Sequence, residues 1–273
     1  MISPLLRSPS LGSKKNGEFH EVSLQTPFTF LVSKSSILCD DFFMQFNFLQ
    51  NEFLKVQVSS IGAELRSIEN LQTGYEYLWQ ADDKWWGRSA PVLFPRIGYE
   101  PSSCETKHGY ARDSEFDLIL ESNTKLTYQL HEELQITYEL QGPKIVTTYN
   151  VLTELPFMIG AHPAFNIEAL PTQVLLPNSK YYKLRDGRID YTNIFESNSQ
   201  FLTINDQTFV DDALVFINDF VGHSAQLSNT IEIEYESELL GVWSPPGAPF
   251  VCLEPWWVNV GEQRSFQFTI SCL

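Results

Sequence analysis

Apolar and polar residues alternate with a period of two along much of the chain from residue 44 onward. This period is typical of β-strands with one buried and one wet face. Gly and Pro residues separate the runs, and no long amphipathic helix with capping residues is found. Short helical turns are expected only at residues 82–86 and 211–214. The alternating runs lie at residues 44–48, 54–59, 134–140, 145–151, 231–235 and 266–270. The pattern predicts an all-β fold, one large antiparallel β-sandwich over residues 44–273.

The first 43 residues differ from the rest of the chain. They are rich in Ser and Lys and carry no sustained period, although residues 29–32 would suit one short strand. We therefore expect residues 1–43 to be an N-terminal extension that is loosely ordered. Alternatively, the start has been misassigned, and Met44 is the true first residue. An ordered N-terminal strand is the alternative interpretation.

The composition indicates a folded, acidic protein. Of 273 residues, 43% are hydrophobic and 19% are charged, which is enough apolar surface for a sizeable core. The 18 basic and 34 acidic residues give a net charge of −16, which repels nucleic-acid phosphates and anionic lipid. The expected partner is therefore a small uncharged molecule, such as a sugar, with no nucleic acid and no membrane. The sequence favours a monomer or a weak homodimer.

The sequence also favours a cytoplasmic protein. No apolar stretch of transmembrane length is found, and the first 20 residues lack the continuous apolar region that is typical of a signal peptide. None of the four cysteines forms a C-x-x-C pair, so neither a zinc site nor a redox motif is predicted. The cysteines are Cys39, Cys104, Cys252 and Cys272.

Three residues are candidates for acid–base chemistry. His108 precedes Gly109 and His162 precedes Pro163, so both rings are expected at sharp turns where they are displayed. Glu254 follows a strongly apolar run, and partial burial there would raise the pKa of its carboxyl group. A purely structural role is the alternative for each. The histidines lack carboxylates at ligand spacing, so no metal site is predicted.

Aromatic residues offer a further signal. Half of the six tryptophans are expected in the core, and the others suit the stacking of a sugar ring, with Trp243 and Trp256 as candidates. The sequence contains no G-x-S-x-G, Walker A, H-E-x-x-H or G-x-G-x-x-G motif, so the corresponding hydrolase, nucleotide and zinc chemistries are not indicated.

Six ordered segments together resemble the aldose 1-epimerase (galactose mutarotase-like) family. Any one of these segments alone would be a weak signal, but their order over residues 46–273 is specific. The segments are Ser60–Ile68, Glu76–Gln80, Trp86–Pro95, His108–Arg112, His162–Asn166 and Leu253–Trp256.

The resemblance implies a large β-sandwich and a cofactor-independent mutarotase that interconverts the anomers of an aldose by ring opening. By position, Glu254 resembles the general base for the C1 hydroxyl, and His162 resembles the general acid for the ring oxygen. His108 resembles a second donor near that oxygen. Asp212 resembles the carboxylate that holds sugar hydroxyls.

The chain departs from the family pattern after Gly98, where Tyr99 replaces an Arg. Arg96 is a candidate substitute, but positions 96 and 99 point to opposite faces of a regular strand. Arg112 is a second candidate for binding sugar oxygens. The alternative for Arg112 is a surface ion pair with Asp113 or Glu115.

Two other functions stay open. A hexose-6-phosphate mutarotase would need arginines at the mouth of the site, for which Arg88, Arg96 and Arg112 are candidates, although the net charge argues against it. A non-catalytic carbohydrate-binding protein on the same fold is suggested by the missing Arg and by shortened loops after Gly98 and Trp256. Anomer exchange with a panel of sugars and sugar phosphates distinguishes the three.

Overall fold

Antiparallel strands make up nearly all of the regular structure in this computed structural model, which describes residues 44–100, 106–218 and 223–273. The predicted extension, residues 1–43, with its expected strand at 29–32, lies outside the described residues. The domain boundary at residue 44 therefore stays a prediction. Among the described residues, no helix is long and apolar enough to span a membrane.

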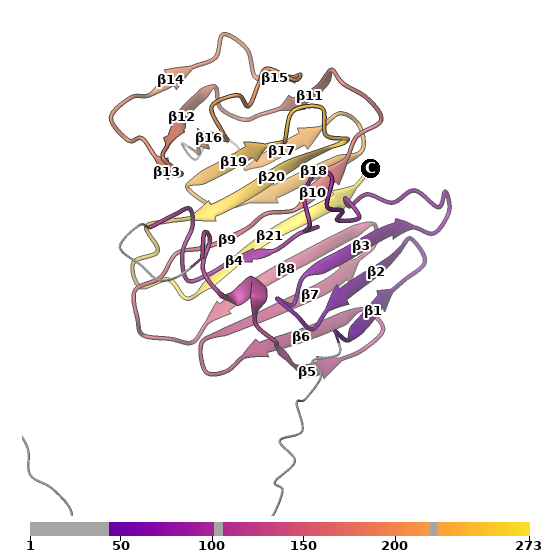
Figure 1. Cartoon of the computed structure of the whole chain (residues 1–273). Coiled ribbons are helices and arrows are strands. Elements are labelled where there is room, and N and C mark those ends of the chain that lie inside the picture. The colour runs from indigo at the N-terminus through magenta and orange to yellow at the C-terminus, as the bar shows by residue number, and fades with distance from the viewer. Residues whose placement is uncertain (1–43, 101–105, 219–222) are drawn as a thin grey trace, which may run out of the picture. The chain divides into compact units, whose positions relative to one another are not determined.

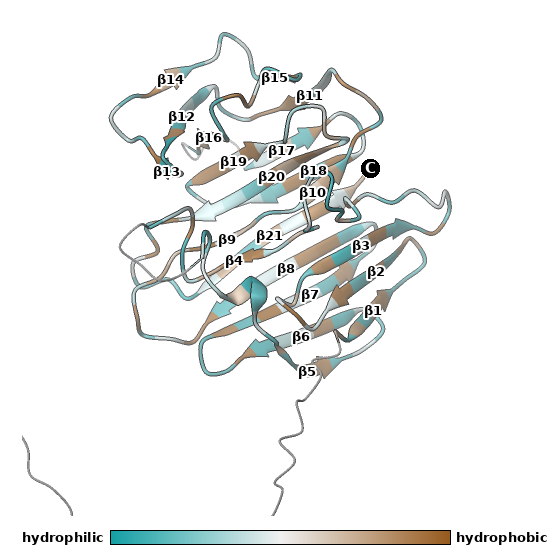
Figure 2. Cartoon of the chain, in the orientation of Figure 1, coloured by the Kyte–Doolittle hydropathy of each residue, from teal (hydrophilic) through white to brown (hydrophobic). Residues whose placement is uncertain are grey.

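One layer is a long sheet in the order β15-β11-β17-β18-β21-β8-β7-β6-β5 (Figure 1). Strand β7 shows why it forms, because its buried and part-buried residues alternate along eight positions, as the hydropathy colours also show (Figure 2). The strands are β5 (Asp117–Glu121), β6 (Lys125–Leu130), β7 (Leu134–Gln141), β8 (Lys144–Val151), β11 (Thr172–Leu175), β15 (Phe201–Ile204), β17 (Ser224–Leu227), β18 (Ile231–Tyr235) and β21 (Ser265–Cys272).

The second large sheet, here called the site sheet, runs in the order β13-β12-β16-β19-β20-β9-β4. Strand β10 also pairs with β20, and β14 with β12. The strands are β4 (Val92–Leu93), β9 (Ile159–Ala161), β10 (Ala164–Asn166), β12 (Lys180–Arg185), β13 (Arg188–Ile189), β14 (Phe195–Glu196), β16 (Leu214–Ile217), β19 (Leu239–Trp243) and β20 (Phe250–Trp257).

A smaller sheet, β1 (Phe46–Gln50), β2 (Leu54–Ser59) and β3 (Leu65–Asn70), packs against one end of the long sheet (Figure 1). Two tyrosines of the long sheet bind it directly. The hydroxyl of Tyr128 donates to Asn47 Oδ1 at 2.9 Å, and that of Tyr138 donates to the carbonyl of Ala63 at 2.8 Å.

A single apolar cluster joins the three sheets and forms the core of the sandwich. Val56 of the small sheet, Ile136 of the long sheet and Leu253 of the site sheet all belong to it and are fully buried. Side chains alternate across a strand, so Leu253 and Trp257 of β20 face this core while Glu254 faces the other way. The predicted all-β sandwich is confirmed. The face of the site sheet that points away from this core carries Glu254.

The predicted strands are present, and the expected helical turns are not helices. Residues 82–86 form a turn closed by a bridge between Asp82 and Trp86, and residues 206–211 form a turn before β16. The only helix in the described ranges is the short 3₁₀ helix η1 (Ala111–Asp113). Gly142, with φ +62°, begins the two-residue turn between β7 and β8.

Candidate active site

Strand β20 positions the candidate base, Glu254, on the outer face of the site sheet. The carboxylate is 1% exposed, and neither of its oxygens meets a donor in good hydrogen-bond geometry. Gly241 of β19 pairs with Glu254 and leaves room above the strand, because a Cβ there would lie 2.8 Å from the ring of Trp256. The absence of a side chain at Gly241 thus makes room for the Trp256 ring beside Glu254.

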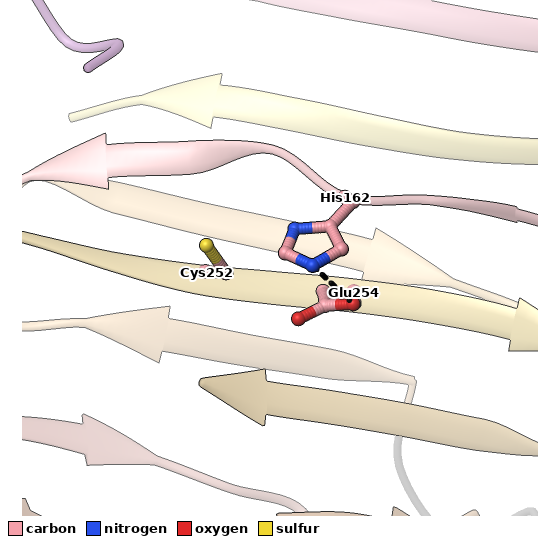
Figure 3. Close-up of side chains that lie close together, drawn as sticks. All are labelled: His162, Cys252 and Glu254. Carbon is pink, nitrogen blue, oxygen red and sulfur yellow. Dashed lines mark ion pairs between the residues drawn. The ribbon is translucent and has the colours of Figure 1, made fainter. Parts of the chain in front are cut away.

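His162 lies between β9 and β10, next to β20. Its backbone N–H donates to the carbonyl of Pro91 at 3.0 Å, and its ring stacks on Trp86 with centroids 4.6 Å apart. Nε2 of His162 lies 3.2 Å from Oε2 of Glu254, as the dashed line in Figure 3 shows. The two side chains predicted as acid and base are therefore in direct contact.

His108 lies in a tight turn that its neighbour makes possible. Gly109 has φ +78°, and a Cβ there would lie 2.2 Å from the carbonyl oxygen of Phe94, so only glycine fits. Nδ1 of His108 accepts the N–H of Gly98 at 3.1 Å. The neutral ring therefore carries its proton on Nε2. Its centroid lies 5.7 Å from that of His162, in an edge-to-face arrangement.

Burial sets the protonation of these groups. It lowers the pKa of His162 to about 3 and lowers the pKa of His108 well below its usual range, with neighbouring cations adding to the effect. Burial also raises the pKa of Glu254 well above its usual range, an effect that Lys107 reduces. The empty site thus favours neutral imidazoles beside a carboxyl group of high basicity.

One cavity of about 580 Å³ is lined by the eight residues that the sequence analysis assigned to catalysis or sugar binding. It lies over the outer face of the site sheet, and its size suits a small molecule. The eight residues that line it are Arg96, His108, Arg112, His162, Asp212, Trp243, Glu254 and Trp256.

A comparison with known protein families identifies the family of this chain. The family model of the aldose 1-epimerases matches residues 101–263. The chain belongs to the aldose 1-epimerase family. Its function is therefore of the general mutarotase type, an isomerase class.

This epimerase family member is similar to one curated protein and to two solved structures. Protein LacX of Lactococcus lactis subsp. lactis is 29% identical over 76% of this chain and 86% of its own length. A galactose mutarotase related enzyme from Lactobacillus acidophilus matches with a TM-score of 0.73 at 21% identity, over 84% of this chain and 97% of that chain. A galactose mutarotase-like protein from Lactobacillus casei matches with a TM-score of 0.70 at 22% identity, over 84% and 100% of the two chains. At this identity the two structures show the shared fold.

Arg112 of this family member lines the cavity and also approaches Asp113, with Nε 3.8 Å from Oδ2. The two interpretations of Arg112 are thus compatible. Arg88 does not line the cavity; its guanidinium donates to the carbonyl of Arg112 at 2.9 Å and pairs with Asp113 and Glu64. Arg88 therefore helps to fix the position of the backbone at Arg112.

Arg96 and Tyr99 both line the cavity, and they do not lie on a strand, so the expectation of opposite faces in a regular strand does not apply to them. That expectation assumed a regular strand, but β4 ends at Leu93 and the chain then bends through Gly98, which has φ +82°. The N–H of Tyr99 bonds to the carbonyl of Gly187 at 3.2 Å, which joins this bend to the turn before β13.

Several lining residues were missed by the sequence analysis. Lys107 and Trp86 lie beside or within the motifs that resemble the family, so adjacency to the motifs was an available signal. Arg188 and Tyr191 come from β13 and the loop after it, where no motif or period marks them. Lys107 Nζ lies 3.9 Å from Oδ2 of Asp212, which places a cation and a carboxylate together at the cavity wall.

Proposed function

We propose that this family member is a cofactor-independent aldose 1-epimerase that interconverts the α and β anomers of an aldose by acid–base ring opening. One observation carries the proposal. Glu254, a buried carboxylate that meets no donor in good hydrogen-bond geometry, faces a small-molecule cavity beside two imidazole rings, at His108 and His162. Ring opening requires a base and an acid at neighbouring oxygens, and this set of groups can supply both.

Glu254 is the base in this proposal. Its carboxylate takes the proton of the C1 hydroxyl, the C1–O5 bond breaks, and O5 receives a proton. The two reacting oxygens are bonded to one carbon, so their protein partners must lie close together. The 3.2 Å between Glu254 Oε2 and His162 Nε2 meets that requirement. A carboxyl group with a raised pKa is a stronger base at neutral pH than an ordinary one.

His162 and His108 are the donors. Both rings are neutral in the empty site, and a neutral imidazole does not give up its N–H proton. His162 therefore takes up a proton as the substrate binds beside Glu254 and transfers it to O5, while His108 stays neutral and donates an N–H hydrogen bond to O5. The hydrogen bond from Gly98 keeps the proton of His108 on the nitrogen opposite Nδ1. Rotation about C1–C2 and the reverse proton transfers then close the other anomer. No electron is gained or lost, so the reaction needs no redox cofactor.

The substrate is held, in this proposal, by the walls of the cavity. Asp212, Arg96 and Arg112 offer charged partners for sugar hydroxyls, and Trp243 and Trp256 offer apolar surface for the ring. A cytoplasmic monomer or weak homodimer with a small sugar as its partner is the setting that we propose.

A hexose 6-phosphate is a second candidate substrate. Four cationic residues line the cavity of this otherwise acidic protein, and such a cluster favours an anionic group. They are Arg96, Lys107, Arg112 and Arg188. Acidic residues in the same lining, among them Glu100 and Asp212, offset part of this charge.

The rate of anomer exchange tests these proposals. Freshly dissolved α-anomers of several aldoses and of their 6-phosphates are followed by polarimetry or by NMR, with wild-type protein and with Glu254→Gln as the matched inactive control. Exchange that exceeds the control for free aldoses supports the first proposal, and exchange limited to the phosphates supports the second. Saturable binding without exchange for any sugar would instead identify a carbohydrate-binding protein.

A further inference from the structure

A cysteine that the proposed reaction does not use lies beside the acid–base pair. Cys252 and Glu254 point to the same face of β20, and the His162 ring lies next to both (Figure 3). One ligand atom from each of the three residues lies within 4.8 Å of the others, and all three side chains are buried. This cluster is not apparent from the sequence, because His162 comes from a different part of the chain.

Polar atoms of this cluster are buried without hydrogen-bond partners and can therefore bind a ligand. Both oxygens of Glu254 are buried and lack a partner in hydrogen-bond geometry, and Nε2 of His162 lies 3.2 Å from one of them. Most buried polar atoms in proteins are hydrogen-bonded, so such groups call for a partner that the protein itself does not supply. A sugar can satisfy Glu254 from the cavity, but it does not account for the neighbouring thiol.

We propose that His162, Cys252 and Glu254 form a binding site for a thiophilic divalent metal ion of the Zn²⁺ type. Imidazole, thiolate and carboxylate are the three ligand types of protein zinc sites. Ligands at about 2.0–2.1 Å from a tetrahedral metal lie about 3.3 Å apart. The 3.2 Å between Nε2 of His162 and Oε2 of Glu254 matches that spacing. The Cys252 sulfur moves closer to complete the set, and the cavity supplies water as the fourth ligand.

The donor set also defines which metals bind. Mg²⁺ and Ca²⁺ prefer oxygen ligands, so a site with one sulfur and one nitrogen selects against them. On binding, the Cys252 thiol releases its proton to solvent and the sulfur donates an electron pair to the metal. No redox step is involved.

The metal would inhibit the enzyme rather than assist it, because it occupies both the base and an acid of the reaction. This consequence rests on the proposed function, whereas metal binding itself does not. The experiment therefore measures binding and exchange separately.

Binding is measured with Co²⁺, which reports thiolate ligation by a charge-transfer absorption. Protein is first stripped with a chelator and then titrated. The variants are Cys252→Ser, Cys252→Ala and His162→Asn, and the matched control is Cys272→Ser, which alters another buried free cysteine on β21. We expect the band in wild type and the control, its loss in all three variants, and binding of Zn²⁺ by competition that weakens by at least about tenfold in them.

Exchange is measured in parallel, with each protein normalised to its own metal-free rate. Zn²⁺ should inhibit wild type and Cys272→Ser at lower concentrations than Cys252→Ser or Cys252→Ala. A Co²⁺ band that survives in both Cys252 variants, or a wild type that binds no Co²⁺, overturns the metal site even if exchange is active. A band that depends on Cys252 in a protein without exchange activity supports the metal site and refutes the proposed function. If one Cys252 variant fails to fold, the other and His162→Asn decide the outcome.

Discussion

Gly241 lies directly opposite Glu254 across the β19–β20 pair, where a Cβ atom would come within 3.2 Å of the Glu254 Cβ and 2.8 Å of the Trp256 ring. The absence of a side chain at Gly241 therefore permits the position of two cavity-lining residues. Backbone conformation is not the reason for this glycine, because a left-handed φ is found at other glycines and not here.

Gly241→Ala should displace the Trp256 ring and with it the carboxylate of Glu254. We expect slower anomer exchange and a free energy of unfolding lower by about 1–3 kcal/mol, because a methyl group is forced into a packed site. Exchange assays and urea denaturation measure the two effects. Gly87→Ala is the control, since a Cβ at Gly87 meets no atom within 4 Å. Equal effects of the two substitutions would contradict this account.

Glu254→Gln should slow exchange by roughly 10²–10⁴-fold, because an amide has the shape of the carboxylate but cannot accept a proton. Sugar binding, measured by calorimetry, should persist, since the variant keeps the cavity. Glu236→Gln, which changes an exposed carboxylate next to β18, should leave the rate unchanged. A fully active Glu254→Gln variant would show that the carboxylate is structural.

His162→Asn should slow exchange to a similar extent, since it removes the ring that lies 3.2 Å from Glu254. The double variant Glu254→Gln/His162→Asn should lose less than the product of the two single effects, because groups that act as a unit are not additive. Strict additivity, measured at saturating sugar in the same assay, would indicate that the two residues act independently.

The strands of the long sheet were predictable because one face is wet, so residues such as those of β7 alternate. Strand β20 carries no such alternation, since all eight of its residues are buried. Only the motif around Glu254 indicated that this strand carries a residue of the candidate site. The bend at residues 96–99 was not predictable from strand geometry, because it depends on a contact between Tyr99 and the distant Gly187. Arg188 enters the cavity through the same contact.

The pH dependence of exchange should report Glu254. Burial raises the pKa of Glu254. As the pH is lowered, the exchange rate of the metal-free protein should therefore begin to fall at a higher pH than it would if the base were a carboxyl group with an ordinary pKa. His162, with a pKa of about 3, titrates below this range and cannot produce that limb. Lys107 opposes the shift and Asp212 enhances it, while Cys252 stays a neutral thiol because burial raises its pKa. A limb near pH 4, measured with a chelator present, would contradict the assignment.

The same burial predicts that Glu254 weakens the fold. A carboxyl group with a raised pKa in the folded state binds its proton more tightly there than in the unfolded chain. Stability is therefore lost as pH rises from the ordinary carboxyl range through the raised pKa. Glu254→Gln removes this loss, so its free energy of unfolding should exceed that of wild type by roughly 1–2 kcal/mol at pH 8 and should approach it at pH 5.

Urea denaturation at both pH values measures the difference. Glu236→Gln serves as the control, since that exposed side chain should show no such dependence. A Glu254→Gln protein less stable than wild type at pH 8 would mean that the carboxylate has stabilising partners, and the availability of Glu254 as a base would have to be reconsidered.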